Sequence, residues 1–132
     1  MTQDHERIAA RIDGFYEAIS GPSGHAHDWG TLASLFIPGA SIVVFRPEGP
    51  LNAATVDTYV DRLKSSLTDR DFYERGFGYR IEVRGDIAQV WSRYEASPGP
   101  DFTEIQRTGT NLIQFARRER DWKIAGMIYQ DD

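Results

Sequence analysis

The chain has 132 residues, a length that fits one domain with its own hydrophobic core. Its formal net charge of −5 argues against nucleic acid or an anionic membrane as the main partner, since both select a basic surface. The absence of cysteine excludes disulfides, thiolate metal sites and cysteine nucleophiles. No stretch approaches the ~20 apolar residues of a membrane span, and the first residues lack the apolar segment of a secretory signal. We therefore expect a single cytoplasmic domain covering residues 1–132.

The first half of the sequence predicts three helices and one strand. Apolar residues at helical spacing predict a helix that ends at Ser20-Gly21-Pro22: Ile8, Ile12, Phe15 and Ile19. A short second helix is expected from about Asp28 to Pro38-Gly39, followed by a strand over residues 40–45. Thr55 is the expected N-cap of a third helix, with this apolar stripe: Val56, Tyr59, Val60, Leu63 and Leu67.

Alternating residues on both sides of Gly85-Asp86 predict a β-hairpin with a two-residue turn. Such a turn fixes the register and places eight residues on one largely apolar face, in four opposed pairs. The pairs are Val83 with Ala88, Ile81 with Val90, Tyr79 with Ser92, and Phe77 with Tyr94. Trp91 is then expected to point away from the core.

The last part of the sequence predicts a second hairpin, centred on Glu119-Arg120. Its expected core face consists of Asn111, Ile113, Phe115, Trp122, Ile124, Gly126 and Ile128. Leu112, Met127 and Tyr129 fall on the other face together with Trp91. That is more apolar surface than a small monomer usually exposes in one patch, so we expect a homodimer through this outer face.

Six segments of the sequence, in this order, resemble the nuclear transport factor 2-like (NTF2-like) superfamily, including its SnoaL-like and ketosteroid-isomerase-like bacterial members. The segments are FYEAISGP (15–22), DW (28–29), LFIPGA (35–40), GDIAQVWSRYE (85–95), GTNLIQ (109–114) and WKI (122–124). The resemblance implies an α+β fold in which three N-terminal helices pack on a strongly curved antiparallel sheet. Such a cystatin-like cone has an internal pocket.

The catalytic residues of the resembling enzymes are not matched here. The position of the isomerase base falls on Val44, which cannot accept a proton, and the only histidines lie in the N-terminal tail and the first loop. Arg93 and Glu95 come nearest to the charged set of the epoxide hydrolases, but the register places both on the outer face. The favoured interpretation is a non-catalytic domain with an apolar internal pocket. The alternatives are a cyclase, dehydratase or isomerase type of enzyme acting on a small, mostly apolar substrate, and a scaffold that binds a partner through its outer face.

The expected ligand-binding residues are Tyr16, Trp29, Phe77, Tyr94 and Asn111. With no inward-facing cation or carboxylate identified, the expected guest is a small apolar or weakly polar molecule. No cofactor and no metal are expected, because His25-Ala26-His27-Asp28 reads as a solvated loop in which Asp28 caps the second helix.

Overall fold

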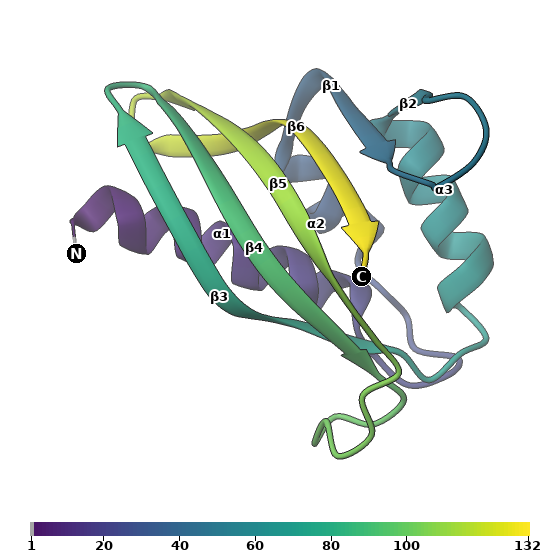
Figure 1. Ribbon diagram of the computed structural model, residues 1–132. Coiled ribbons are helices and arrows are strands. Elements are labelled where there is room, and N and C mark those ends of the chain that lie inside the picture. Colours follow the sequence, from purple (N-terminus) through teal and green to yellow (C-terminus); the bar gives the residue numbers. More distant parts are fainter. Residues whose placement is uncertain (1) are drawn as a thin grey trace.

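The computed structural model describes residues 2–132, with three helices and six strands (Figure 1). The helices are α1 (Gln3–Ile19), α2 (Trp29–Ser34) and α3 (Val56–Leu67). The strands are β1 (Phe36–Val44), β2 (Ala53–Thr55), β3 (Tyr73–Arg84), β4 (Ile87–Ser97), β5 (Arg107–Arg118) and β6 (Asp121–Asp131). The predicted α+β class, with three helices on a curved sheet, is confirmed.

The helices begin where the sequence supplies a capping side chain. The side chains of Thr2, Asp28 and Thr55 accept hydrogen bonds from backbone N–H groups in the first turns of α1, α2 and α3. The predicted apolar stripe of α1 is buried along its whole length. The second helix is shorter than expected, because Leu35 is already its C-cap and Phe36 opens β1.

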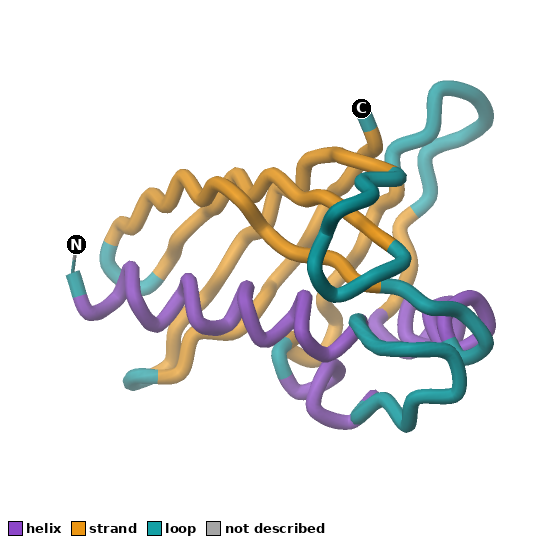
Figure 2. The backbone as a smooth tube through the Cα atoms, turned by 90° about the horizontal axis from the view of Figure 1, so that it is seen from below, coloured by secondary structure: helices purple, strands orange, loops and turns teal. Residues whose placement is uncertain are grey.

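The strands form one sheet in the order β2-β1-β6-β5-β4-β3. Every neighbouring pair is antiparallel except β1 with β6, which is parallel. The sheet is therefore mixed, whereas the sequence predicted an antiparallel one. The parallel pair arises because β1 comes from the helical half of the chain and joins the sheet beside the last strand. Figure 2 shows α1 running across one face of this sheet.

The hairpin of β3 and β4 has the predicted register near its turn and departs from it at Phe77. Tyr79, Ile81 and Val83 pair as expected, but the register shifts between Gly76 and Gly78. Phe77 is the extra residue of this β-bulge; it is 50% exposed, with Arg93 over its ring at 5.5 Å. The prediction that Phe77 faces inward opposite Tyr94 is therefore wrong.

A second bulge, in β6, changes the predicted faces of the last hairpin. Phe115 pairs with Ile124 but Gln114 pairs with Gly126, so Ala125 is the extra residue. Every later side chain of β6 consequently changes face. Met127 is 2% exposed and Ile128 is 47% exposed, the reverse of the prediction. Tyr129 also turns inward and packs against the core.

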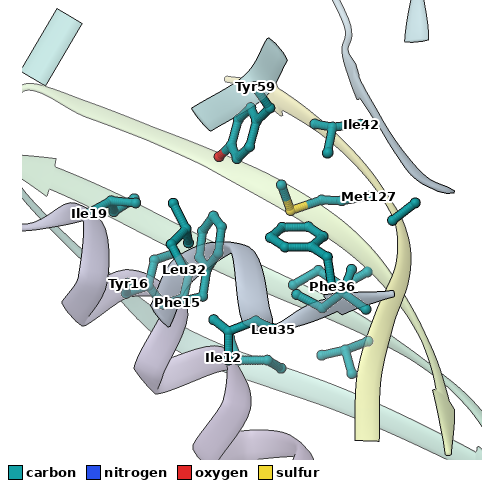
Figure 3. Packing of buried hydrophobic residues seen from close by; sticks show 14 of the residues in the cluster. Ile12, Phe15, Tyr16, Ile19, Leu32, Leu35, Phe36, Ile42, Tyr59 and Met127 are labelled. Atoms are coloured by element: carbon teal, nitrogen blue, oxygen red, sulfur yellow. The ribbon is translucent and has the colours of Figure 1, made fainter. Parts of the chain in front are cut away.

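The hydrophobic core lies between the helices and the sheet face that they cover. Figure 3 shows how side chains from α1, α2, β1, α3 and β6 meet there. The opposite face leaves Trp91 and Ile128 exposed, so the predicted outward direction of Trp91 is confirmed. Within residues 2–132, no helix combines the length and the apolar composition that crossing a membrane requires.

Candidate functional site

The inner face of the sheet becomes polar at the end far from the Gly85-Asp86 turn. One cross-strand row there consists of Glu74, Ala96 and Arg107. The next row consists of Gly76, Tyr94, Gly109 and Asp131. Directly opposed residues share a face, so both rows point to the side on which the helices lie. The four large side chains of these rows, those of Glu74, Arg107, Tyr94 and Asp131, line a space between the sheet and the helices.

A cavity of about 370 Å³ occupies this space, within the range of small-molecule sites. One wall is apolar and comes from α1, β1, β2 and α3: Phe15, Ile19, Ile42, Val44, Ala54, Leu63 and Leu67. The remaining lining is aromatic, polar and charged: Arg46, Tyr59, Arg62, Ser66, Arg70, Phe72, Glu74, Tyr94, Arg107, Asn111, Tyr129 and Asp131. The cavity therefore differs from the apolar pocket that the sequence suggested.

Glu74 is the carboxylate in this cavity with the most perturbed ionisation. Its backbone is tied to α1 through Ser20, whose hydroxyl accepts from the Glu74 N–H at 3.0 Å and donates to the Tyr16 carbonyl oxygen at 2.7 Å. Among residues 2–132 its carboxylate has neither a hydrogen bond nor a salt bridge. Burial, reinforced by Asp131 and opposed by Arg107, raises the pKa of Glu74 to about 7. Glu74 can therefore gain or lose a proton near neutral pH.

Tyr94 reaches across β5 to a partner on β6. Its hydroxyl donates a hydrogen bond to Asp131 Oδ1 at 2.6 Å, and Arg107 Nε lies 3.4 Å from the same oxygen. Gly109 lies between Tyr94 and Asp131 in the cross-strand row, and its missing side chain leaves room for the ring. Burial and the hydrogen bond to Asp131 raise the pKa of Tyr94, so its hydroxyl stays neutral.

Two other tyrosines offer free hydroxyl groups to the cavity. Tyr59, from α3, is 5% exposed, and Tyr129, from β6, lies with its ring centroid 6.4 Å away. In Figure 3 the hydroxyl end of Tyr59 points into the interior. Neither hydroxyl has a hydrogen-bond partner in the described part of the chain, and burial raises the pKa of both. Both groups can therefore donate to a guest molecule.

Of the five ligand-binding residues expected from the sequence, two line the cavity and three do not. Tyr94 and Asn111 line the cavity. Tyr16 lies outside the lining: its buried hydroxyl bonds Ser92 Oγ at 2.6 Å and accepts from Asn111 Nδ2 at 2.9 Å. Trp29 stacks on His27 at 4.7 Å, also outside the lining. Phe77 is exposed on the bulge of β3.

The two carboxylates of the lining were missed because a bulge reverses the inward phase of each strand before it reaches them. With Phe77 treated as an ordinary strand residue, alternation puts Glu74 outside; with Ala125 treated likewise, it puts Asp131 outside. Arg107 was within reach of sequence reasoning, since it is in phase with the inward Asn111 along β5. Within residues 2–132 no group of three or more His, Asp or Glu side chains could hold a metal ion.

Comparison with solved structures shows which fold this is. A Nostoc punctiforme protein of unknown function with a cystatin-like fold matches with a TM-score of 0.79 at 10% identity, over 100% of this chain and 93% of its own. A Silicibacter pomeroyi NTF2-like protein of unknown function matches with a TM-score of 0.69 at 19% identity, over all of both chains. The chain has the NTF2-like fold.

A third NTF2-like structure, from Streptomyces avermitilis, is described as a candidate dehydratase. It matches with a TM-score of 0.67 at 19% identity, over 98% of this chain and 96% of its own. No protein-family model and no functionally curated protein matches the sequence. The resemblance to uncharacterised bacterial NTF2-like proteins is thus shown at the level of the fold.

The raised pKa of Glu74 predicts a pH-dependent effect of Glu74→Gln on stability. The folded protein holds this proton more tightly than the unfolded chain, whose pKa is near 4.5. The contribution of Glu74 protonation to stability is therefore complete below pH 4.5 and is lost as the pH rises through 7. Glutamine has no charge to bury, so the variant should match the wild type at pH 4.5 and exceed it by about 1–3 kcal/mol at pH 8.

Urea unfolding of the two proteins at pH 4.5, 6 and 8 measures this difference. Glu82→Gln, an exposed change on the same strand, is the matched control and should show no comparable pH dependence. Equal stabilities of wild type and Glu74→Gln at pH 8 would mean that the Glu74 carboxylate is well solvated.

Proposed function

We propose that this NTF2-like domain binds a small organic molecule in the cavity between α3 and the inner sheet face. The observation that carries the proposal is the lining itself, an apolar wall opposite hydrogen-bonding groups that have no protein partner. Ligand sites are typically mostly apolar, with a few polar groups that orient the guest. The free hydroxyls of Tyr59 and Tyr129 and the Glu74 carboxylate are such groups. These three groups are not fully shut off from solvent, so a guest would take the place of water at them.

Thermal-shift screening against small metabolites tests this function, with a cavity-filling variant to locate the site. Val44 lines the cavity, whereas Val43 on the same strand faces the other way, in register with Ile128. We expect Val44→Trp to abolish the stabilisation that a binding compound gives to the wild type. Val43→Trp should retain it.

Circular dichroism establishes that each variant is folded. If Val44→Trp does not fold, Ala54→Trp fills the cavity from β2 and serves in its place. Binding unchanged in a folded cavity-filling variant would place the ligand elsewhere, and the proposal would fail.

A second candidate function is acid–base catalysis on the bound molecule. The observation that favours it is Glu74, whose pKa of about 7 suits a group that both accepts and donates a proton at neutral pH. Isomerases, dehydratases and cyclases all need such a group. In that case Glu74→Gln would still bind the substrate but lose turnover by roughly 10²-fold or more.

We also propose that a second copy of the chain covers the outer sheet face. Trp91, Leu112, Ile128 and Val43 lie in one cross-strand row on the side away from the helices. Ile128 thus lies on the outer face, where the sequence predicted Met127 and Tyr129. Arg80 and Glu82 beside the row carry opposite charges, which suits a self-complementary two-fold contact.

Sedimentation at micromolar concentration tests this assembly. The wild type should show the doubled mass and Trp91→Glu the single mass, because a carboxylate buried in an apolar contact is costly. Ile105→Glu, at an equally exposed apolar residue outside the row, should remain dimeric. A wild-type monomer would remove this proposal and leave the cavity proposal intact.

A further inference from the structure

We propose that the guest of the cavity is a small organic acid with an apolar body, held by its carboxylate at the arginine-lined rim. The inference rests on the proposed function and names the class of ligand. Four arginines line the cavity against two carboxylates, in a chain whose formal net charge is −5. The cavity thus gathers positive charge on an otherwise acidic protein.

The arginines come from different parts of the chain and converge on one rim. Arg46 follows β1, Arg62 lies on α3, Arg70 lies between α3 and β3, and Arg107 opens β5. Two of them contact the same aromatic ring, since the guanidinium carbons of Arg70 and Arg107 each lie 5.8 Å from the centroid of Phe72. A concave site in which one sign of charge predominates concentrates ligands of the opposite sign.

Three of these arginines have no acidic partner. Arg107 lies 3.4 Å from Asp131, whereas Arg46, Arg62 and Arg70 make no salt bridge or side-chain hydrogen bond within residues 2–132. A guanidinium offers paired N–H donors that match the two oxygens of a carboxylate. The rim can therefore receive a carboxylate without first breaking a protein salt bridge.

The cavity favours a singly charged head with an apolar body. Glu74 and Asp131 face the same space and offset part of the arginines' attraction, while a phosphate dianion costs more to desolvate than a carboxylate. The apolar wall formed by residues of α1, β1, β2 and α3 then covers the rest of the molecule. A volume of about 370 Å³ suits an aromatic acid or a short-chain aliphatic acid.

Binding of such an anion should be coupled to protonation of Glu74. The titratable and charged groups that surround Glu74 are Tyr16 from α1, Tyr59 and Arg62 from α3, Arg70, Arg46, Tyr94 from β4, Arg107 from β5, and Tyr129 and Asp131 from β6. The tyrosines are neutral, so the charges are those of the arginines and Asp131. An incoming carboxylate adds negative charge beside Glu74 and so favours its neutral form. By linkage, the anion binds more tightly where Glu74 is already protonated, below about pH 7.

Methyl NMR titrations with matched acid and amide pairs test the proposal. The probes are hexanoate, benzoate and 2-naphthoate, with their primary amides, and phenyl phosphate. At pH 6.5 and low salt, at least one acid should shift the methyl signals of Ile19, Ile42, Val44 and Leu63. It should bind at least fivefold more tightly than its amide. Equal affinity of acid and amide would overturn the anion proposal and leave small-molecule binding standing.

Variants separate the charge of the rim from the shape of the cavity. Arg62→Gln/Arg70→Gln should weaken acid binding about tenfold and leave amide binding unchanged, whereas Arg84→Gln, at the far end of β3, should change neither. Between pH 6.5 and 8.5 acid binding should weaken roughly tenfold in the wild type and stay constant in Glu74→Gln. Acid binding that withstands loss of both arginines, phenyl phosphate binding more tightly than benzoate, or no shift by any acid at millimolar concentration would overturn the proposal.

Discussion

Replacing Gly109 by alanine is expected to cost roughly 3–5 kcal/mol of unfolding free energy, the largest effect of any substitution considered. A β-carbon at position 109 would overlap the hydroxyl end of Tyr94 and the backbone carbonyl oxygen of Gln130. The carbonyl belongs to the paired strand β6 and cannot move without disturbing the ladder. Tyr94 can move only by giving up its hydrogen bond to Asp131. The variant therefore loses both packing and the bond that shapes the cavity floor.

Gly14→Ala is the same substitution at another glycine, and we expect it to raise the free energy of unfolding instead of lowering it. Gly14 lies inside α1, and a β-carbon there would meet nothing within 4 Å. Alanine in a helix interior is more favourable than glycine by about 0.5–1 kcal/mol. Urea or thermal unfolding of both variants against the wild type measures the contrast. A Gly109→Ala protein as stable as the wild type would contradict the close approach of Tyr94 to β5.

Removing the hydroxyl of Tyr16 is expected to cost roughly 2–4 kcal/mol, the second-largest effect. In the core this hydroxyl joins Ser92 Oγ at 2.6 Å and Asn111 Nδ2 at 2.9 Å. Ser92 is fully buried and Asn111 is 3% exposed. Tyr16→Phe therefore leaves two polar side chains without this hydrogen-bond partner, where water cannot replace it. The structure thus gives Tyr16 a stabilising role that tolerates no apolar substitute.

Two further variants test whether the lost stability of Tyr16→Phe comes from the hydrogen bonds of this hydroxyl. Tyr73→Phe removes a hydroxyl that has no hydrogen-bond partner among residues 2–132, and it should change stability little. Adding Asn111→Leu to Tyr16→Phe should cost less than the sum of the single changes, because each removes a partner of the other. Additive losses in the double variant would show that the hydroxyl and the amide act independently.

The helices, the strand order along the chain and much of the core followed from the sequence because they depend on local periodicity. The stripe of α1 and the pairs from Tyr79 to Val83 needed only regular spacing and a two-residue turn. Parallel pairing of β1 with β6 is a contact between distant segments, and no local pattern specifies it. Fold similarity at 10–19% identity then supports the overall arrangement without assigning an activity.

The candidate site was mostly hidden from the sequence, and the reason is the same for each missed carboxylate. A bulge adds one residue and reverses the inward phase of everything beyond it. Phe77 and Ala125 carry no signal that marks them as the extra residues, since both fit an alternating strand. Tyr94 and Asn111 face inward as the alternation predicts, because no bulge separates them from the regular pattern of their strands.

The bulge at Phe77 turns Glu74 toward the cavity, where its carboxylate has no hydrogen bond or salt bridge among residues 2–132. An NMR titration of the Glu74 side-chain carboxyl carbon, assigned by its loss in Glu74→Gln, tests this claim most directly. We expect a midpoint near pH 7, because burial and Asp131 outweigh Arg107. A midpoint near pH 4.5, the ordinary value, would show a carboxylate in open water or held by a cation, and would contradict the account.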